Sequence, residues 1–209
     1  MELIGEKAIK LALPEHLGKL VTEHITQSKV INTTEQVSDV VVYWGLDEMT
    51  KLNKLMRLKS NLPSPIRRDY SYPGLYKPFD HQAATAEFLS INEKAFCFNE
   101  AGTGKTSSAL WAADYLMKQG KIKKVLIICP LSIMYSAWQG DVFNTCMHRS
   151  SVVCYGTAHK RKTIIEGDYD FTIINYDGVN IIRDEIKKEK FDLIIVDECN
   201  AYKTHTTVR

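Results

Sequence analysis

A glycine-rich segment in the middle of the chain constrains the fold more than any other stretch. Residues 99–106 are Asn-Glu-Ala-Gly-Thr-Gly-Lys-Thr. The apolar run at residues 95–98 in front of this segment is typical of a buried strand, and residues 107–116 behind it have apolar side chains at helical spacing. A glycine loop between a strand and a helix favours phosphate binding, because glycines let backbone N–H groups point inward and a helix N-terminus attracts anions. The sequence therefore predicts a nucleoside triphosphate site.

The residue types of this segment have separate expected roles. Gly102 and Gly104 shape the loop, Lys105 reaches the β- and γ-phosphates, and the Thr106 hydroxyl holds Mg²⁺. The general pattern has a further glycine where this chain has Asn99, but Gly-x-Gly-Lys-Thr is retained. The residues of this segment expected to contact ATP are Gly102, Thr103, Gly104, Lys105, Thr106 and Ser107.

A second motif follows the apolar run at residues 193–196, where the chain continues with Asp197 and Glu198. Two surface acids after a strand are common, but opposite a glycine loop they supply what ATP hydrolysis requires. Asp197 would anchor Mg²⁺, and Glu198 would act as general base on the attacking water. The two motifs together are more specific than either alone. The central expectation is that the Lys105 amine and both carboxylates converge on one metal-bound triphosphate.

Apolar runs and helical segments alternate in the second part of the chain. The runs are nearly continuous in apolar character, as in parallel strands that are covered on both faces. They lie at residues 95–98, 125–129, 152–155, 171–175 and 193–196. This pattern predicts an α/β fold: a RecA-like P-loop lobe with a central parallel sheet, spanning residues 77–209.

The first part of the chain has a different pattern, which predicts a small α+β domain over residues 1–60. Its expected strands are 7–13, 29–32 and 37–44, and its expected helices are 15–25 and 47–58. Four of the six prolines fall between Pro63 and Pro78, so residues 61–76 are predicted to be a linker rich in proline and aromatic residues. No catalytic cluster is visible in residues 1–60.

Composition excludes several classes of protein. The net charge of +2 gives no global basic field, so any nucleic-acid surface must be local. The five cysteines show no C-x-x-C spacing, which argues for a reducing cytosol and against a zinc site or disulfides. No signal peptide or run of membrane-spanning length is present, so we expect a cytoplasmic protein without a membrane partner. We also expect a monomer.

With these motifs, residues 76–209 resemble the first motor lobe of superfamily 2 helicases and translocases, and most of all the Swi/Snf-like branch. That branch includes phage DNA helicases, so a phage-encoded protein is one expectation. The resemblance rests on Tyr-Lys-Pro-Phe-Asp-His-Gln at 76–82, the glycine loop, Cys-Pro-Leu-Ser-Ile at 129–133 with Trp138, Tyr-Gly at 155–156, Ile-Asn-Tyr at 174–176 and Asp-Glu-Cys-Asn at 197–200. It implies that Gln82 contacts adenine and that Lys77 lies at the nucleotide. We expect Trp138 to be packed core.

The resemblance also implies ATP and Mg²⁺ as cofactors and DNA as a partner that is bound through phosphates, without sequence preference. The expected DNA contacts are Pro130, Leu131, Ser132, Ser136, Gly156, Thr157, Lys160, Arg161 and Asn175. The basic run His-Lys-Arg-Lys at 159–162 has a solvated helix face as its alternative. Relatives have a small residue and a histidine at the positions of Cys199 and Asn200, so we expect Asn200 to couple the nucleotide to the rest of the motor differently.

Motors of this type need a second RecA-like lobe that supplies arginine fingers, and this chain stops at Arg209. We therefore expect a piece of a longer motor, which alone binds nucleotide weakly and does not translocate. Three other functions remain open. They are an RNA helicase lobe, a small-molecule kinase and a non-catalytic nucleotide-binding or interaction module. The RNA helicase lobe is disfavoured by the Pro-Leu-Ser segment, and the kinase by the motif that ends in Gln82. The non-catalytic module is disfavoured by the intact Lys105, Thr106, Asp197 and Glu198.

Overall fold

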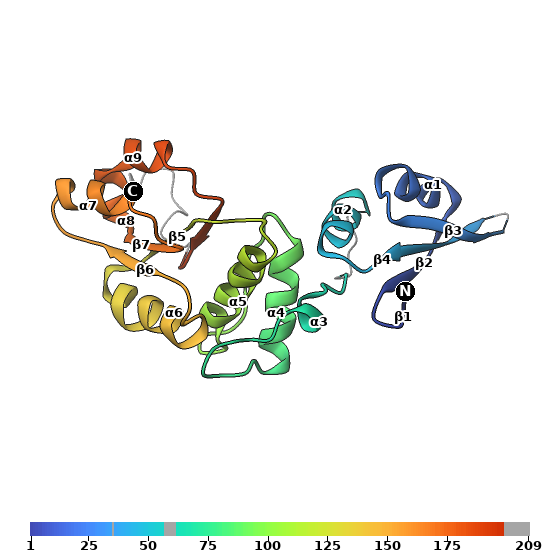
Figure 1. Cartoon of the computed structure of the whole chain (residues 1–209), viewed down its shortest axis with the longest axis horizontal. Coiled ribbons are helices and arrows are strands. Elements are labelled where there is room, and N and C mark those ends of the chain that lie inside the picture. The colour runs from blue at the N-terminus through green and yellow to red at the C-terminus, as the bar shows by residue number, and fades with distance from the viewer. Residues whose placement is uncertain (35, 57–61, 199–209) are drawn as a thin grey trace. The chain divides into compact units, whose positions relative to one another are not determined.

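The computed structural model describes residues 1–34, 36–56 and 62–198 (Figure 1). The chain forms two compact units: residues 1–71 with 83–98, and residues 72–82 with residue 99 onward. Helix α4 (Asp80–Ile91) begins in the second unit and continues in the first. The domain boundaries drawn from the sequence stay a prediction.

The first unit contains a four-stranded antiparallel sheet with strand order β1-β2-β4-β3. Its elements are β1 (Glu2–Ile4), β2 (Ala8–Pro14), α1 (Glu15–His24), β3 (Ser28–Thr33), β4 (Val37–Tyr43), α2 (Leu46–Met56) and α3 (Ile66–Asp69). The alternating side chains Ile9, Leu11 and Leu13 of β2 are buried, and the residues between them are not. The strands and helices expected in residues 1–56 are therefore present. The end of the expected helix at residues 57–58 lies outside the described residues.

The second unit contains a parallel sheet with strand order β6-β7-β5-β8. Its strands are β5 (Val125–Cys129), β6 (Ser151–Cys154), β7 (Phe171–Asn175) and β8 (Leu193–Val196). The helical elements are α5 (Lys105–Lys118), the 3₁₀ turn η1 (Leu131–Ile133), the π-helix η2 (Met134–Gln139), α6 (Gly140–Thr145), α7 (Ala158–Ile165), α8 (Tyr176–Ile181) and α9 (Arg183–Lys188). The predicted α/β fold with a central parallel sheet is confirmed.

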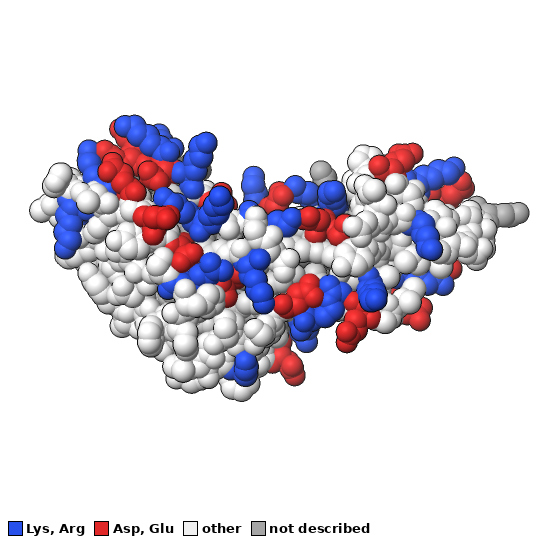
Figure 2. All heavy atoms as spheres, in the orientation of Figure 1, with Lys and Arg blue, Asp and Glu red and all other residues white. Residues whose placement is uncertain are grey.

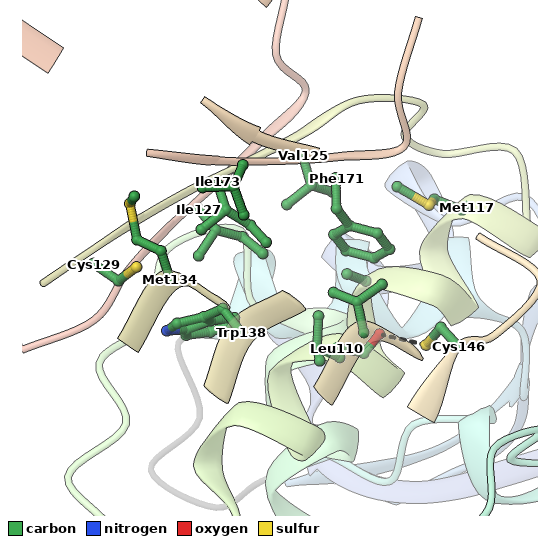
Figure 3. Packing of buried hydrophobic residues seen from close by; sticks show 13 residues of the cluster. Leu110, Met117, Val125, Ile127, Cys129, Met134, Trp138, Cys146, Phe171 and Ile173 are labelled. Atoms are coloured by element: carbon green, nitrogen blue, oxygen red, sulfur yellow. Dashed lines mark hydrogen bonds between the residues drawn. The ribbon is translucent and has the colours of Figure 1, made fainter. Parts of the chain in front are cut away.

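Alternation along β5 divides the core of this unit between the two faces of the sheet. Val125, Ile127 and Cys129 belong to a cluster that includes residues of α5, η2 and α6 (Figure 3). Leu126 and Ile128 point to the other face and pack with residues of α7 and α8. Because β5 is buried on both faces, its sequence is apolar at every position.

The strand predicted at residues 95–98 is wrong. These residues have no strand pairing, and Phe96 and Phe98 are 71% and 86% exposed. An apolar run shows that a segment is compatible with a buried strand, but a strand also needs an edge with which to pair. Local sequence does not supply that partner.

Strand β8 lies at one edge of the parallel sheet, and its exposed residues follow from that position. Leu193 and Ile195 pack against the cluster on the α5 face. Ile194 and Val196, which point to the opposite face, are 54% and 39% exposed. Among the described residues, no helix combines the length and apolar character that a membrane crossing requires.

Candidate functional site

The glycine loop leads directly into α5. Gly102 and Gly104 have φ angles of 76° and 78°, a left-handed conformation that other residues adopt only with strain. Gly104 is the N-cap of α5 and provides no side-chain cap. The first N–H groups of a helix lack partners within the helix, so in α5 they are not satisfied by a capping side chain and can bind an anion.

Lys105 folds back over this loop. Its Nζ donates hydrogen bonds to the carbonyl oxygens of Asn99 and Glu100, at 2.9 and 2.8 Å. The Thr103 hydroxyl also donates to the Glu100 carbonyl, at 2.8 Å. The loop is thus held in a turned conformation by its own side chains, with the amine at its centre. A phosphate would compete with these two carbonyl groups for the amine.

Gln82 contacts the same loop. Its Nε2 donates to the Thr103 carbonyl at 3.2 Å, and its Oε1 accepts from the Phe79 N–H at 3.0 Å. A Cβ added at Gly104 would overlap Gln82 Nε2, and the φ angle of 78° at Gly104 also favours glycine. His81 Nε2 lies 3.1 Å from the Thr103 carbonyl. The segment that precedes the loop by about 20 residues is therefore in direct contact with it. The expected Lys77 instead donates to the Tyr72 carbonyl at 2.7 Å.

Asp197 extends the pairing of β8 with β5, because its N–H donates to the Ile128 carbonyl at 2.9 Å. Its side chain accepts two hydrogen bonds. Trp138 Nε1 donates to Oδ2 at 3.0 Å, and the Glu198 N–H donates to Oδ1 at 2.9 Å. Burial, with a further contribution from the nearby Asp197 carboxylate, raises the pKa of the Cys129 thiol to about 12. The acid therefore lies at the carboxyl end of the sheet, beside the end of β5.

Glu198 has a φ angle of 49°, which is uncommon for a residue other than glycine. Such conformations cost about 1–3 kcal/mol and persist where surrounding contacts determine them. Here the Tyr176 hydroxyl donates to the Asp197 carbonyl and lies 3.3 Å from the Glu198 carbonyl. Cys199 and Asn200 lie outside the described residues.

Asp197 and Thr106 suit a magnesium ion only if phosphates complete its coordination shell. The described residues contain no group of three or more His, Cys, Asp or Glu side chains that could hold a metal ion. Mg²⁺ commonly takes one or two carboxylates together with substrate phosphates and water. One carboxylate at Asp197 and one hydroxyl at Thr106 fit that pattern.

The segment after β5 presents polar groups at the surface. Leu131, Ser132, Tyr135 and Ser136 are exposed. Trp138 is 2% exposed and is part of the core as expected. Asp141 is the only charged residue (Asp, Glu, Lys or Arg) among residues 130–147. Figure 2 shows a surface free of these charges where α6 lies. Any phosphate contact in this segment would thus use hydroxyl and backbone N–H groups.

The segment after β6 is also exposed. Gly156 has a φ angle of 119°, and Thr157 caps α7 by accepting from the Lys160 N–H at 3.3 Å. Lys160 is exposed and its side chain packs over Gly156. Lys162 forms an ion pair with Glu185 of α9, which raises the pKa of Lys162 and lowers that of Glu185. The basic run is therefore not a uniform cationic face.

Arg161 and Asn175 are buried, with exposures of 4% and 6%. Arg161 Nη1 donates to the Cys154 carbonyl at 2.6 Å and to Asn175 Oδ1 at 3.2 Å, and its Nε donates to the Gly156 carbonyl at 3.0 Å. This guanidinium connects the carboxyl ends of β6 and β7. Arg161 was predicted to contact DNA because it lies in a run of basic residues. In the structure its side chain is buried and donates its hydrogen bonds to protein groups.

Gly178 of α8 packs against this connection. We predict that Gly178→Ala destabilises the protein by about 1–3 kcal/mol, because the added methyl group would overlap Arg161 Nη1 and lie 2.8 Å from Asn175 Oδ1. Urea unfolding measures the change. Gly140→Ala is the matched control: this helical glycine has nothing nearer than 3.7 Å to an added Cβ, so alanine should stabilise by about 0.5–1 kcal/mol. Equal effects of the two substitutions would contradict this account of Gly178.

The parallel sheet, the glycine loop at the start of α5 and the acids after β8 define the class of the fold: a RecA-like P-loop lobe. Residues 76–207 match the family model "Type III restriction enzyme, res subunit". The match covers more than half of the chain, so the chain belongs to this family.

Two similar proteins agree with this assignment. The "Uncharacterized ATP-dependent helicase YqhH" of Bacillus subtilis (strain 168) is 24% identical over 170 residues, which cover 78% of this chain and 29% of that protein. The structure "Sulfolobus solfataricus SWI2/SNF2 ATPase core in complex with dsDNA" has a TM-score of 0.55 at 23% identity, and the match covers 65% of this chain and 29% of that one. The predicted Swi/Snf-like resemblance is confirmed at the level of the fold. The chain spans less than a third of the length of either relative.

Proposed function

We propose that this chain is the first motor lobe of an ATP-dependent DNA helicase or translocase of the Swi/Snf-like type. The observation that carries the proposal is the presence of two features in the same unit of the fold. One is a glycine loop at an N-terminus of α5 that no side chain caps, and the other is an Asp-Glu pair at the carboxyl end of a parallel sheet. In sheets of this kind ligands bind at the carboxyl ends of the strands.

In the proposed mechanism, ATP binds with its phosphates against the glycine loop. Lys105 exchanges its two carbonyl partners for the β- and γ-phosphate oxygens, and the first N–H groups of α5 bind the same phosphates. Thr106 and Asp197 would hold Mg²⁺, which supplies neutralisation of phosphate charge. Glu198 would take a proton from the attacking water. Gln82, already in contact with the loop, would sense whether the site is filled.

DNA would lie across the carboxyl ends of β5, β6 and β7. The surface groups suited to phosphate binding are the hydroxyls of Ser132, Ser136 and Thr157 and the amine of Lys160. Contacts of this type read no base sequence. The SWI2/SNF2 ATPase core of Sulfolobus solfataricus is in complex with double-stranded DNA, which supports duplex DNA as the first ligand to test here.

Binding and turnover measurements on the 209-residue chain test the proposal. We expect a fluorescent ATP analogue to bind the 209-residue chain weakly, only with Mg²⁺, and duplex DNA to bind without sequence preference. A first lobe measured on its own should hydrolyse ATP slowly, since the arginine finger of a partner lobe contributes about 10³–10⁵ in rate. Nucleotide binding that ignores Mg²⁺ would contradict the site, and fast DNA-stimulated turnover would contradict the one-lobe proposal.

A further inference from the structure

Trp138 connects the segment after β5 to Asp197. The π-helix η2 carries Trp138. It follows η1, which contains the exposed Ser132, one of the residues proposed to contact DNA. The indole ring is buried in the core cluster, and Figure 3 shows its nitrogen on the Cys129 side of that cluster. From there the N–H donates to Asp197 Oδ2 at 3.0 Å. Single-turn π-helices are rare and frequently occur at functional sites.

The backbone around Asp197 is held separately from its side chain. The Asp197 N–H is bonded to β5, and the Tyr176 hydroxyl binds the Asp197 carbonyl. Tyr176 begins α8 immediately after Asn175, at the end of β7. With the backbone held by these two contacts, the carboxylate changes partners by rotation of its own side chain or by movement of the indole.

Each oxygen of the carboxylate already accepts one hydrogen bond, and these two bonds fix the orientation in which its remaining lone pairs can meet a metal or its water ligands. Oδ1 accepts from the Glu198 N–H, and Oδ2 accepts from Trp138. A hydrogen bond to a charged acceptor contributes about 1.5–3 kcal/mol, so the indole N–H substantially opposes any reorientation of this carboxylate toward Mg²⁺.

We propose that Trp138 is a positioning residue that restrains the Asp197 carboxylate until DNA binds. This inference rests on the proposed function. DNA that contacts residues 130–136 shifts the start of η2, moves the indole away from Oδ2 and frees the carboxylate for Mg²⁺-nucleotide. By linkage, Mg²⁺-nucleotide then tightens DNA binding by the same factor. The contact between Trp138 and Asp197 supplies the coupling between DNA binding and nucleotide binding. The sequence motifs by themselves do not contain this contact.

Trp138→Phe tests the restraint, because phenylalanine keeps the apolar ring and removes the N–H. Without DNA, we expect the variant to bind Mg²⁺ and the fluorescent ATP analogue about tenfold more tightly than the wild type. Added duplex DNA should tighten binding by about tenfold in the wild type and by less than about twofold in the variant. A variant that was merely damaged would bind more weakly.

Trp111→Phe is the matched control. Trp111 is 1% exposed, and its indole N–H has no hydrogen-bond partner among the described residues. This variant should keep the wild-type affinity and the wild-type effect of DNA. An equal change in both variants, or no change in Trp138→Phe, would overturn the proposal.

A measurement on the wild type covers the case in which Trp138→Phe does not fold. The chain has three tryptophans, so three indole N–H signals can be followed by NMR. The Trp138 signal should exchange slowly with solvent in the free protein and faster after duplex DNA is added, and an unchanged rate would overturn the proposal. If wild type binds nucleotide and DNA without mutual effect, only the coupling fails. If it binds no Mg²⁺-nucleotide at all, the proposed function fails.

Discussion

Lys105→Ala is expected to weaken binding of Mg²⁺-ATP by about 10- to 100-fold. The amine is the charged donor at the centre of the glycine loop, and its present partners, the carbonyl oxygens of Asn99 and Glu100, are neutral. A triphosphate is a much stronger acceptor for it, and hydrogen bonds to charged groups contribute about 1.5–3 kcal/mol. Equilibrium binding of the fluorescent ATP analogue, measured at fixed Mg²⁺, gives the affinity ratio.

Lys118→Ala is the control for this substitution. Lys118 is an exposed lysine in the last turn of the same helix, so its removal changes the net charge equally. We expect its affinity for the analogue to stay within about twofold of the wild type, since an exposed charge far from the ligand is screened by salt. Similar losses in both variants would show that the glycine loop does not bind the phosphates.

Asp114→Ala is expected to destabilise the second unit by about 3 kcal/mol. The Asp114 side chain, in α5, is 2% exposed and accepts from Arg149 Nε at 2.6 Å and from His148 Nε2 at 3.1 Å. Burial opposes the charge on Arg149, but Asp114 and then Asp170 outweigh it and raise the pKa of the guanidinium. Removing Asp114 leaves a partly buried cation with one remaining carboxylate at 3.3 Å. Urea unfolding of the variant measures the loss of stability.

The exposed pair of Glu15 and Lys19 in α1 supplies the comparison. Its atoms are also close, at 2.6 Å, but its side chains are 47% and 69% exposed. Solvent screens such a pair, so Glu15→Ala should leave the urea unfolding midpoint almost unchanged. The prediction is wrong if both substitutions have the same effect, because burial of Asp114 is the reason for the expected difference.

The predicted strands that lie inside the parallel sheet were found within one residue of their ends. Residues 125–129 and 171–175 are apolar at nearly every position because both faces of their strands are covered, so the pattern reports the structure directly. The same argument failed at residues 95–98, which are equally apolar but have no strand pairing. The composition of a segment shows whether it can be buried. Whether it forms a strand also depends on a second segment with which its backbone can pair.

In the candidate site, too, some features could be recognised from the sequence and others only from the structure. The glycine loop, Lys105, Thr106 and the Asp-Glu pair are recognisable from residue type and spacing, because phosphate and metal chemistry accept few other residues. Arg161 has the same sequence signature as its exposed neighbour Lys160, but one is buried at the strand ends and the other is in solvent. The partnership of Trp138 with Asp197 joins residues 59 positions apart.

The sequence alone determined the class of the fold, the succession of the paired parallel strands along the chain and the position of the nucleotide motifs. These depend on local properties: apolar runs, glycines at special backbone angles, and charged residues next to them. Only the tertiary structure decided which basic side chains are buried, what holds Asp197, and that Gln82 contacts the glycine loop. Those outcomes depend on which segments lie next to each other in space, and burial and hydrogen bonding then assign each side chain its partner.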